Sequence, residues 1–372
     1  MMRKINTKLF DTINNIDKKD WDLLNKHQDD LFVSWDFCNI LEKSNIKINY
    51  LLIYDNEEAI GKAIFSFIKL DLLEIAPLEK RKIIKLLLKV FNKNNKVAVM
   101  HVGIPIAFSE SSLRVKNRDY YNLVVNELIK IFQKKFKSRI LLFSFLDSIQ
   151  VQQIQNKLLY KISFFFNYFL YNNFTSFNNY IENMKNKYSR HLLFIEKYIK
   201  KNKINYRSST RFSSELYRLY SNIFYSSDYK FRKLTPHFFY NLLSDRNIKS
   251  SLVKIFKGEN LIGFFIITES ESRLYFNFYG AQSSINSKIK SPYFFVLNFL
   301  IKNSIKKGKN LYLGSTSDFV KMRYGSNQQK RFLLVNIKNK FFWLLIKLLK
   351  FNFKNKSQIN VFKNPQIHRE SY

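Results

Sequence analysis

The chain has 372 residues, of which 46% are hydrophobic and 24% are charged, a globular composition with enough material for two domains of average size. Its formal net charge is +35, which favours anionic partners such as nucleic acid, anionic lipid or nucleotide-linked substrates. Lys, Asn, Ile, Phe and Tyr are abundant together, so an A+T-rich coding sequence is the alternative explanation for much of this charge.

Cysteine and histidine usage argues against two kinds of site. Cys38 is the single cysteine, so the chain has neither a disulfide framework nor a multi-cysteine zinc site. The five histidines are scattered, without metal-ligand spacing, and we expect no metal. The sequence has no signal-peptide pattern at its start and no stretch near the roughly 20 apolar residues of a membrane-spanning helix. We therefore expect a cytoplasmic protein.

Apolar spacing in the first half predicts a mixed α/β unit of about 170 residues. The predicted elements are a helical region at 17–42, a β-hairpin formed by 48–55 and 59–70, a helix at 78–92, a strand at 96–105, a polar loop at 109–119, a helix at 120–135, a strand at 139–146, a helix at 149–159 and a strand at 161–171. Gly61, inside the second hairpin strand, indicates a bulge or a close approach of another element.

The second half has a more regular pattern. It predicts a long helix capped by Ser176, helices at 213–225 and 236–243, a three-strand meander at 251–257, 261–268 and 273–280, a helix at 291–308, a strand at 310–315, a short helix at 316–325 and a strand at 331–337. Pro292 fits the first turn of its helix and Gly308 fits the C-terminal cap. Residues 351–372 have a composition typical of disorder.

Three motifs in the second half lie in a consistent order. They are Tyr180-Ile-Glu-Asn-Met-Lys-Asn-Lys-Tyr-Ser-Arg190, then Tyr279-Gly280-Ala281 followed by Ser291-Pro292, and then Lys321-Met-Arg-Tyr324-Gly325. They resemble the "Y…L..K.R", "Y-G…SP…G" and "K-x-x-F-G" segments of FemAB-type and related peptidoglycan- or exopolysaccharide-associated GNAT proteins. Trp35-Asp36-Phe37 with Leu41-Glu42-Lys43-Ser44 is similar to their "F…LE.S" helix, so the resemblance spans most of residues 20–337.

The order of predicted elements in the second half is also similar to that of the GNAT acyltransferase fold, and both halves share a hairpin, helix, strand order. The resemblance implies an α/β (mixed α+β) protein made of two tandem GNAT-like modules, each a splayed mixed sheet flanked by helices. We expect the modules at 1–172 and 173–338, followed by a basic-apolar C-terminal helix and tail at 339–372.

The resemblance leaves the donor open. Ordinary acetyltransferases bind the coenzyme A pyrophosphate with a glycine-rich turn before the helix that corresponds to 291–308. Residues 282–292 of this chain (QSSINSKIKSP) contain no glycine. FemAB-type proteins instead take aminoacyl-tRNA, a donor that would give the basic surface a purpose. Acyl-CoA and aminoacyl-tRNA both stay open as donor substrates.

Six residues are candidates for the site. Lys187 and Arg190, three apart on one helical face, would hold a phosphate or carboxylate; the alternative is a solvated basic face. Lys321 would stabilise a developing oxyanion and Tyr324 would donate a proton to the leaving group; the alternative is that Lys321 is exposed and Tyr324 packs under its helix. Tyr279 and the helix start at Ser291 would contact substrate, although an aromatic in such a strand is by default a core residue.

The C-terminal segment 340–350 is a short apolar run flanked by lysines. It fits either a peripheral contact with the inner face of a membrane or a helix docked on the second module.

The expected activity is an N-acyltransferase that moves an acyl or aminoacyl group to an amine on a cell-envelope or polysaccharide precursor. Its acceptor would be a small molecule or a lipid- or sugar-linked molecule, and tRNA is a candidate partner. The alternative is a non-catalytic GNAT-shaped module that binds RNA or an anionic glycan. The sequence does not give the oligomeric state.

Overall fold

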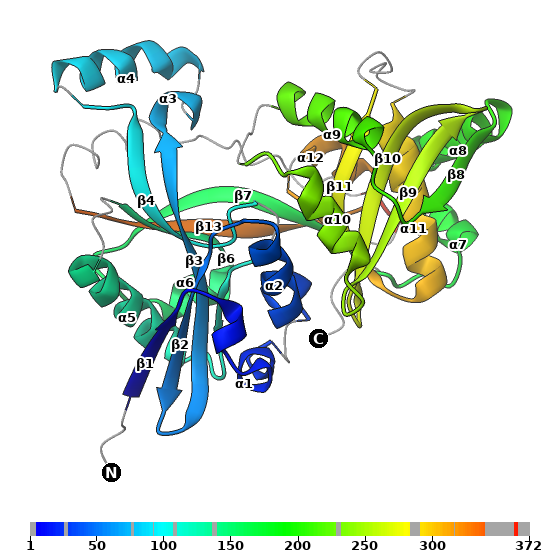
Figure 1. Ribbon diagram of the computed structural model, residues 1–372. Helices are drawn as coiled ribbons and strands as arrows, with labels where there is room; N and C mark the ends of the chain where they lie inside the picture. The colour runs from blue at the N-terminus through cyan, green and yellow to red at the C-terminus, as the bar shows by residue number, and fades with distance from the viewer. Residues whose placement is uncertain are drawn as a thin grey trace. The chain divides into compact units, whose positions relative to one another are not determined.

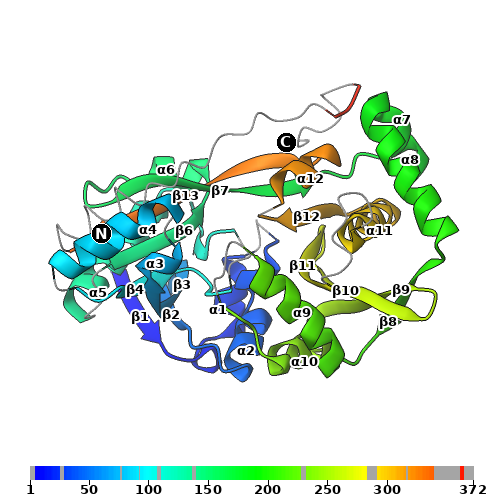
Figure 2. The ribbon, with the colours of Figure 1, turned by 90° about the horizontal axis from the view of Figure 1, so that it is seen from above.

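The chain divides into two compact units, drawn in Figures 1 and 2. Unit 1 comprises Met1–Phe165 with Lys330–Asn355, and unit 2 comprises Phe166–Gln329 with Lys356–Tyr372. The computed structural model describes residues 5–25, 29–75, 78–91, 93–106, 110–135, 140–227, 232–282, 291–315, 317–338 and 361–363.

Unit 1 contains a mixed sheet with strand order β1-β2-β3-β4-β6-β13, and β5 pairs with β3. The strands are β1 (Ile5–Phe10), β2 (Asn49–Asp55), β3 (Glu58–Asp71), β4 (Lys96–Val102), β5 (Leu113–Val115), β6 (Ile140–Leu146) and β13 (Asn327–Ile337). The β4–β6 pair is parallel, whereas the other pairs in this sheet are antiparallel.

Helices cover the unit 1 sheet. They are α1 (Lys18–Leu23), α2 (Trp35–Lys43), α3 (Leu72–Ile75), α4 (Leu78–Val90), α5 (Tyr120–Lys135) and α6 (Ser148–Gln153), with short 3-10 turns at Ile13–Asn15 and Leu31–Val33. Figure 1 shows α5 on one side of the strands and α1 and α2 on the other. The apolar stripe of α5 packs against β2, β3, β4 and β6, as its amphipathic pattern predicts.

The close approach predicted at Gly61 is confirmed. The pairing of β2 and β3 shifts register between Ile53 and Tyr54, opposite Gly61, which is the signature of a bulge. A Cβ placed on Gly61 would lie 2.4 Å from the Val124 Cγ2 atom of α5. Glycine is therefore required here because α5 packs directly on the backbone of β3.

Gly61→Ala should lower the free energy of unfolding of unit 1 by about 1–3 kcal/mol, because the added methyl overpacks the contact with α5. The measurement is thermal and urea unfolding. In a Val124→Ala background, which removes the methyl that the new Cβ meets, the same substitution should cost less than half as much. An equal cost in both backgrounds would show that backbone conformation, and not this contact, selects glycine.

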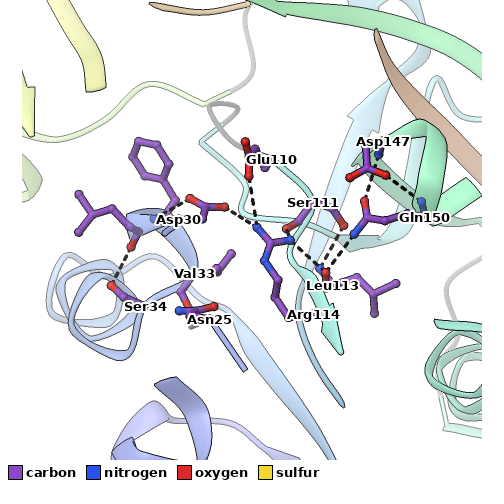
Figure 3. Close-up of polar contacts among 12 residues, drawn as sticks. Asn25, Asp30, Val33, Ser34, Glu110, Ser111, Leu113, Arg114, Asp147 and Gln150 are labelled. Carbon is purple, nitrogen blue, oxygen red and sulfur yellow. Dashed lines mark hydrogen bonds and ion pairs between the residues drawn. The ribbon is translucent and has the colours of Figure 1, made fainter. Parts of the chain in front are cut away.

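A buried charge cluster holds the loop that precedes α2 to strand β5 in unit 1 (Figure 3). The Arg114 guanidinium donates to the Asp30 carboxylate at 2.6 Å, and the two side chains are 2% and 1% exposed. Arg114 also donates to the carbonyls of Ser111 and Leu113, and Glu110 lies 3.8 Å away. Because a buried charge is costly unless it is paired, this cluster fixes the loop geometry.

The "F…LE.S" segment has a structural role in unit 1. The Glu42 carboxylate accepts hydrogen bonds from the Thr12 hydroxyl, the Ile13 amide and the Tyr50 hydroxyl. The Ser44 hydroxyl donates to the Ile40 carbonyl at the end of α2. Glu42 thus connects α2 to β2 and to the first 3-10 turn through hydrogen bonds. These contacts give the motif a structural role and not a catalytic one.

In unit 2 the strand order is β7-β12-β11-β10-β9-β8, with β11 and β12 parallel and the other pairs in this order antiparallel. Its strands are β7 (Tyr160–Leu170), β8 (Ile204–Ser209), β9 (Lys249–Lys257), β10 (Asn260–Glu269), β11 (Arg273–Ala281) and β12 (Asn310–Gly314). Its helices are α7 (Phe177–Asn183), α8 (Asn186–Lys201), α9 (Ser214–Ser226), α10 (Pro236–Ser244), α11 (Pro292–Lys307) and α12 (Asp318–Arg323). Figure 2 shows α9 and α10 on one side of the sheet, with α8 and α11 on the other. The predicted mixed α/β class is confirmed.

Local signals in unit 2 are largely confirmed. The Ser176 hydroxyl accepts from the Asn179 amide, Pro292 occupies the first turn of α11, and Gly308 ends α11 in the left-handed region with φ 65°. The long helix predicted after Ser176 is wrong in one respect, because extended backbone at Met184 separates α7 from α8. Strands β1, β5 and β8 were not predicted.

The end of the chain corrects another expectation. Residues 351–372 were predicted to be disordered, yet Val361 and Phe362 are 1% and 3% exposed in the core of unit 2. Met184 forms a β-bridge with Phe362, and the Lys185 amide donates to the Val361 carbonyl at 2.9 Å. This bridge ends α7, which explains why one predicted helix became two. The predicted membrane segment 340–350 lies outside the described residues.

The division of the chain falls inside β7 and β13, whereas the predicted module boundaries were 172/173 and 338/339. Residues of β13 from Phe332 to Ile337 pair with β6 in unit 1. Residues of β7 from Tyr168 to Leu170 pair with β12 in unit 2. Among the described helices, none is both long and apolar enough to cross a membrane.

Candidate active site

The two parallel strands of unit 2 separate toward their carboxyl ends. Strand β11 has nine residues but pairs with β12 only from Arg273 to Tyr275, opposite Asn310 to Tyr312. Beyond that point β11 continues beside β10 as far as Ala281, while Gly314 of β12 pairs with Tyr168 of β7. The sheet is therefore splayed at the carboxyl ends of β11 and β12, where open α/β sheets bind ligands.

Tyr279 and Ser291 are brought together beside this separation. The side chain of Tyr279, near the end of β11, lies close to Ser291, the N-cap of α11. The ring centroid of Tyr293, in the first turn of α11, lies 5.6 Å from that of Tyr279, and its side chain lies close to Ser317, the N-cap of α12. Burial raises the pKa of both tyrosines, so both hydroxyls stay protonated near neutral pH.

Lys321 lies on α12 with its ammonium group buried at the end of β12. The side chain is 1% exposed, so the alternative of a solvent-exposed lysine is wrong. Its Nζ donates to the carbonyl oxygens of Gly314 at 3.2 Å and Ser315 at 2.8 Å. It also lies 5.3 Å from the Tyr168 ring, a cation–π distance.

Burial lowers the pKa of Lys321 to about 7, and Asp318 opposes this shift. Near neutral pH the group is therefore divided between its ammonium and amine forms. An ammonium group has three N–H donors, and the two strand-end carbonyls account for two of them. Within the described residues, no further hydrogen-bond acceptor is recorded for the third donor, and the Tyr168 ring lies beside the ammonium group.

Tyr324 follows α12 and is 1% exposed. Its carbonyl accepts from the Tyr180 hydroxyl at 2.6 Å, and its ring stacks on Phe294 at 6.3 Å. Burial raises the pKa of the phenol, and within the described ranges the hydroxyl has no hydrogen-bond partner. Tyr180 and Tyr324 thus join two of the motifs by a structural contact, and an acid role for Tyr324 remains a prediction.

Lys187 and Arg190 are exposed on α8, and the structure records no ion pair for either within its described part. Helix α8 contacts the site residues through His191, which follows Arg190. The His191 ring packs edge-on against Phe294 at 5.3 Å and Tyr324 at 6.0 Å, and burial, with Arg323 nearby, lowers its pKa. Sequence reasoning missed His191, although it lies one helical turn after Lys187.

In unit 1, the parallel strands β4 and β6 carry side chains that contact each other near their carboxyl ends. His101 of β4 and Ser144 of β6 are hydrogen-bonded at 2.7 Å, and burial lowers the pKa of His101 to about 4. A Cβ on Gly103 would lie 2.5 Å from the His101 Nε2 atom and 2.6 Å from the Ser144 Oγ atom. Side chains are therefore packed together at this place.

Two further observations bear on ligands. Among the described residues, no cluster of three His, Cys, Asp or Glu side chains could hold a metal ion. A depression of about 660 Å³ lies over the β9–β10 hairpin and the start of α9, but the candidate residues do not line it. Residues 283–290, which correspond to the donor-binding turn of acetyltransferases, lie outside the described ranges.

No family model and no curated protein matches the sequence. Solved structures do match the fold. FemX is 9% identical with a TM-score of 0.56, over 89% of this chain and 98% of that one. L-PGS from Bacillus licheniformis is 9% identical with a TM-score of 0.54, over 90% and 94%.

The C-terminal domain of a putative lysylphosphatidylglycerol synthetase from Agrobacterium fabrum is 9% identical with a TM-score of 0.54, over 90% of this chain and 95% of that one. The chain shares the fold of these proteins over about nine tenths of its length. The resemblance predicted from the three motifs is confirmed at the level of the fold.

Proposed function

We propose that unit 2 is an acyl- or aminoacyltransferase that acts on an amine of a cell-envelope or polysaccharide precursor. The observation that carries this proposal is the buried Lys321 ammonium at the separated carboxyl ends of β11 and β12. A lysine kept out of water, and held by two carbonyls at a sheet opening, is pre-organised to meet developing negative charge.

In the proposed reaction, the acceptor amine attacks the carbonyl carbon of the donor ester or thioester. The carbonyl oxygen becomes an oxyanion, which accepts a hydrogen bond from the third N–H of Lys321. Collapse of this intermediate forms the amide and breaks the bond to the leaving oxygen or sulfur, which takes up the proton lost by the amine. Catalysis rests on positioning and charge stabilisation.

Two donors fit this chemistry, acyl-CoA and aminoacyl-tRNA. The net charge of +35 and the absence of glycine from residues 282–292 favour aminoacyl-tRNA, the more highly charged of the two donors. The fold shared with FemX and with lysylphosphatidylglycerol synthetase supports the same choice, together with a lipid- or sugar-linked acceptor. Intact-mass analysis of acceptor amines incubated with charged tRNA, or with a panel of acyl-CoAs, would separate the two donors.

Lys187→Gln combined with Arg190→Gln should raise KM for the anionic substrate about tenfold and change kcat little, because a charge-assisted clamp binds ground and transition states alike. Steady-state kinetics at low salt checks this. Lys197→Gln, on the same helix, is the matched control. A fall in kcat with unchanged KM would contradict the binding role.

A second candidate function is a non-catalytic module that binds RNA or an anionic glycan. The missing glycines in residues 282–292 favour it, because close approach of a coenzyme A pyrophosphate needs them. Strong, salt-sensitive polyanion binding without any product in the mass analysis would select this function over the transferase.

A further inference from the structure

Helix α4 of unit 1 has apolar residues on two faces. Ile84 and Leu88 are buried against Leu72, Val97, Val99 and Ile140, where they form a small core of their own. On the outer face, Ile83, Leu86 and Val90 are 54%, 62% and 68% exposed. These three residues, which we call the outer apolar stripe, follow the i, i+3, i+7 spacing of a single helical face.

A basic stripe runs beside the outer apolar stripe. Lys82, Lys85 and Lys89 are exposed, and at 100° per residue they lie between the outer apolar stripe and the buried face of Ile84 and Leu88. Residues 72–96 contain seven Lys or Arg and two Glu in the sequence. Figure 1 shows α4 lying across the ends of β3 and β4, at the opposite end of unit 1 from the β2–β3 turn.

We infer that the outer face of α4 docks on an anionic lipid bilayer. Three large aliphatic side chains gain from leaving water, and three lysines at their edge match anionic headgroups, which is the pattern of an interfacial helix. A nucleic-acid backbone would satisfy the lysines but not bury the aliphatic stripe. A second copy of this face would bring like charges together across a two-fold axis.

This inference does not depend on the proposed function, since vesicle binding requires no transfer activity. It places the membrane contact on unit 1, in the residues of α4, and leaves segment 340–350 aside. The bilayer would then hold the protein near lipid-linked molecules.

Vesicle co-sedimentation of the full chain tests the inference, with phosphatidylcholine vesicles that contain or lack phosphatidylglycerol. The wild type should bind the anionic vesicles, and binding should weaken as salt rises. Lys82→Glu, Lys85→Glu and Lys89→Glu together should lower the partition coefficient at least tenfold. Leu86→Ser with Val90→Ser should lower it to a similar extent, and circular dichroism should show an unchanged fold.

Matched controls come from unit 1. Lys47→Glu changes an exposed lysine, and Leu158→Ser changes a leucine that is 50% exposed, both outside α4; binding should stay within twofold of the wild type. Equal binding by the α4 variants and the wild type would overturn the inference. So would sedimentation analysis that shows a dimer lost in Leu86→Ser, because a second copy would then be the occupant.

Discussion

Replacing Lys321 with methionine should lower kcat/KM for transfer at least tenfold. Methionine keeps the aliphatic volume but removes the donors that face Gly314, Ser315 and the proposed oxyanion. Loss of an oxyanion donor typically costs about 10²–10³ in kcat. Steady-state kinetics with the donor found by mass analysis is the measurement, and Lys47→Met, at an exposed position, is the control.

The pH dependence separates an electrostatic role of Lys321 from a packing role. The ammonium form is the donor, and burial lowers its pKa to about 7, so the wild-type rate should carry a descending limb as pH rises through 7. Lys321→Arg stays cationic over this range and should lack that limb. A rate that is unchanged in Lys321→Met would remove this residue from the mechanism.

The same shift predicts a change in stability with a definite sign. Between pH 7 and the ordinary lysine pKa of 10.5, the unfolded chain holds a proton on residue 321 that the folded chain releases. The contribution of Lys321 to stability therefore increases as pH rises from 7 toward 10.5. Lys321→Met should flatten the pH profile of unfolding in this window, which gives a readout besides activity.

Asp30→Asn should destabilise unit 1 by about 3–5 kcal/mol, because it leaves the buried Arg114 guanidinium without its closest anionic partner. Urea unfolding followed by tryptophan fluorescence measures this, since Trp21 and Trp35 both lie in unit 1. Glu58→Gln disrupts an exposed pair with Lys116 and should cost less than about 1 kcal/mol.

A double variant sharpens the Asp30 prediction. Asp30→Leu with Arg114→Met removes both charges and should recover much of the stability lost in Asp30→Asn, because it leaves no uncompensated ion. A loss below about 1 kcal/mol in Asp30→Asn alone would mean that the remaining groups around Arg114 are enough to hold the loop.

The candidate site was predicted only in part from the sequence. Tyr279, Ser291 and Lys321 were proposed from motif order, and the structure places them around the separated ends of β11 and β12. The burial of Lys321 had no local signal, because the sequence of residues 316–325 reads the same for a buried and a solvated lysine. His191 was missed because its neighbours, Phe294 and Tyr324, are remote in sequence.

The sequence by itself determined the elements whose signals are local: the β9–β10–β11 meander from alternating apolar runs, α11 from Ser291, Pro292 and Gly308, and the tight packing at Gly61. Tertiary structure alone decided which strands pair and which polar groups are buried away from solvent. Strand β13 pairs with β6, Phe362 enters the core beside Tyr180, and Lys321 meets the end of β12. These outcomes depend on contacts between distant residues, whose free energies no short window of sequence contains.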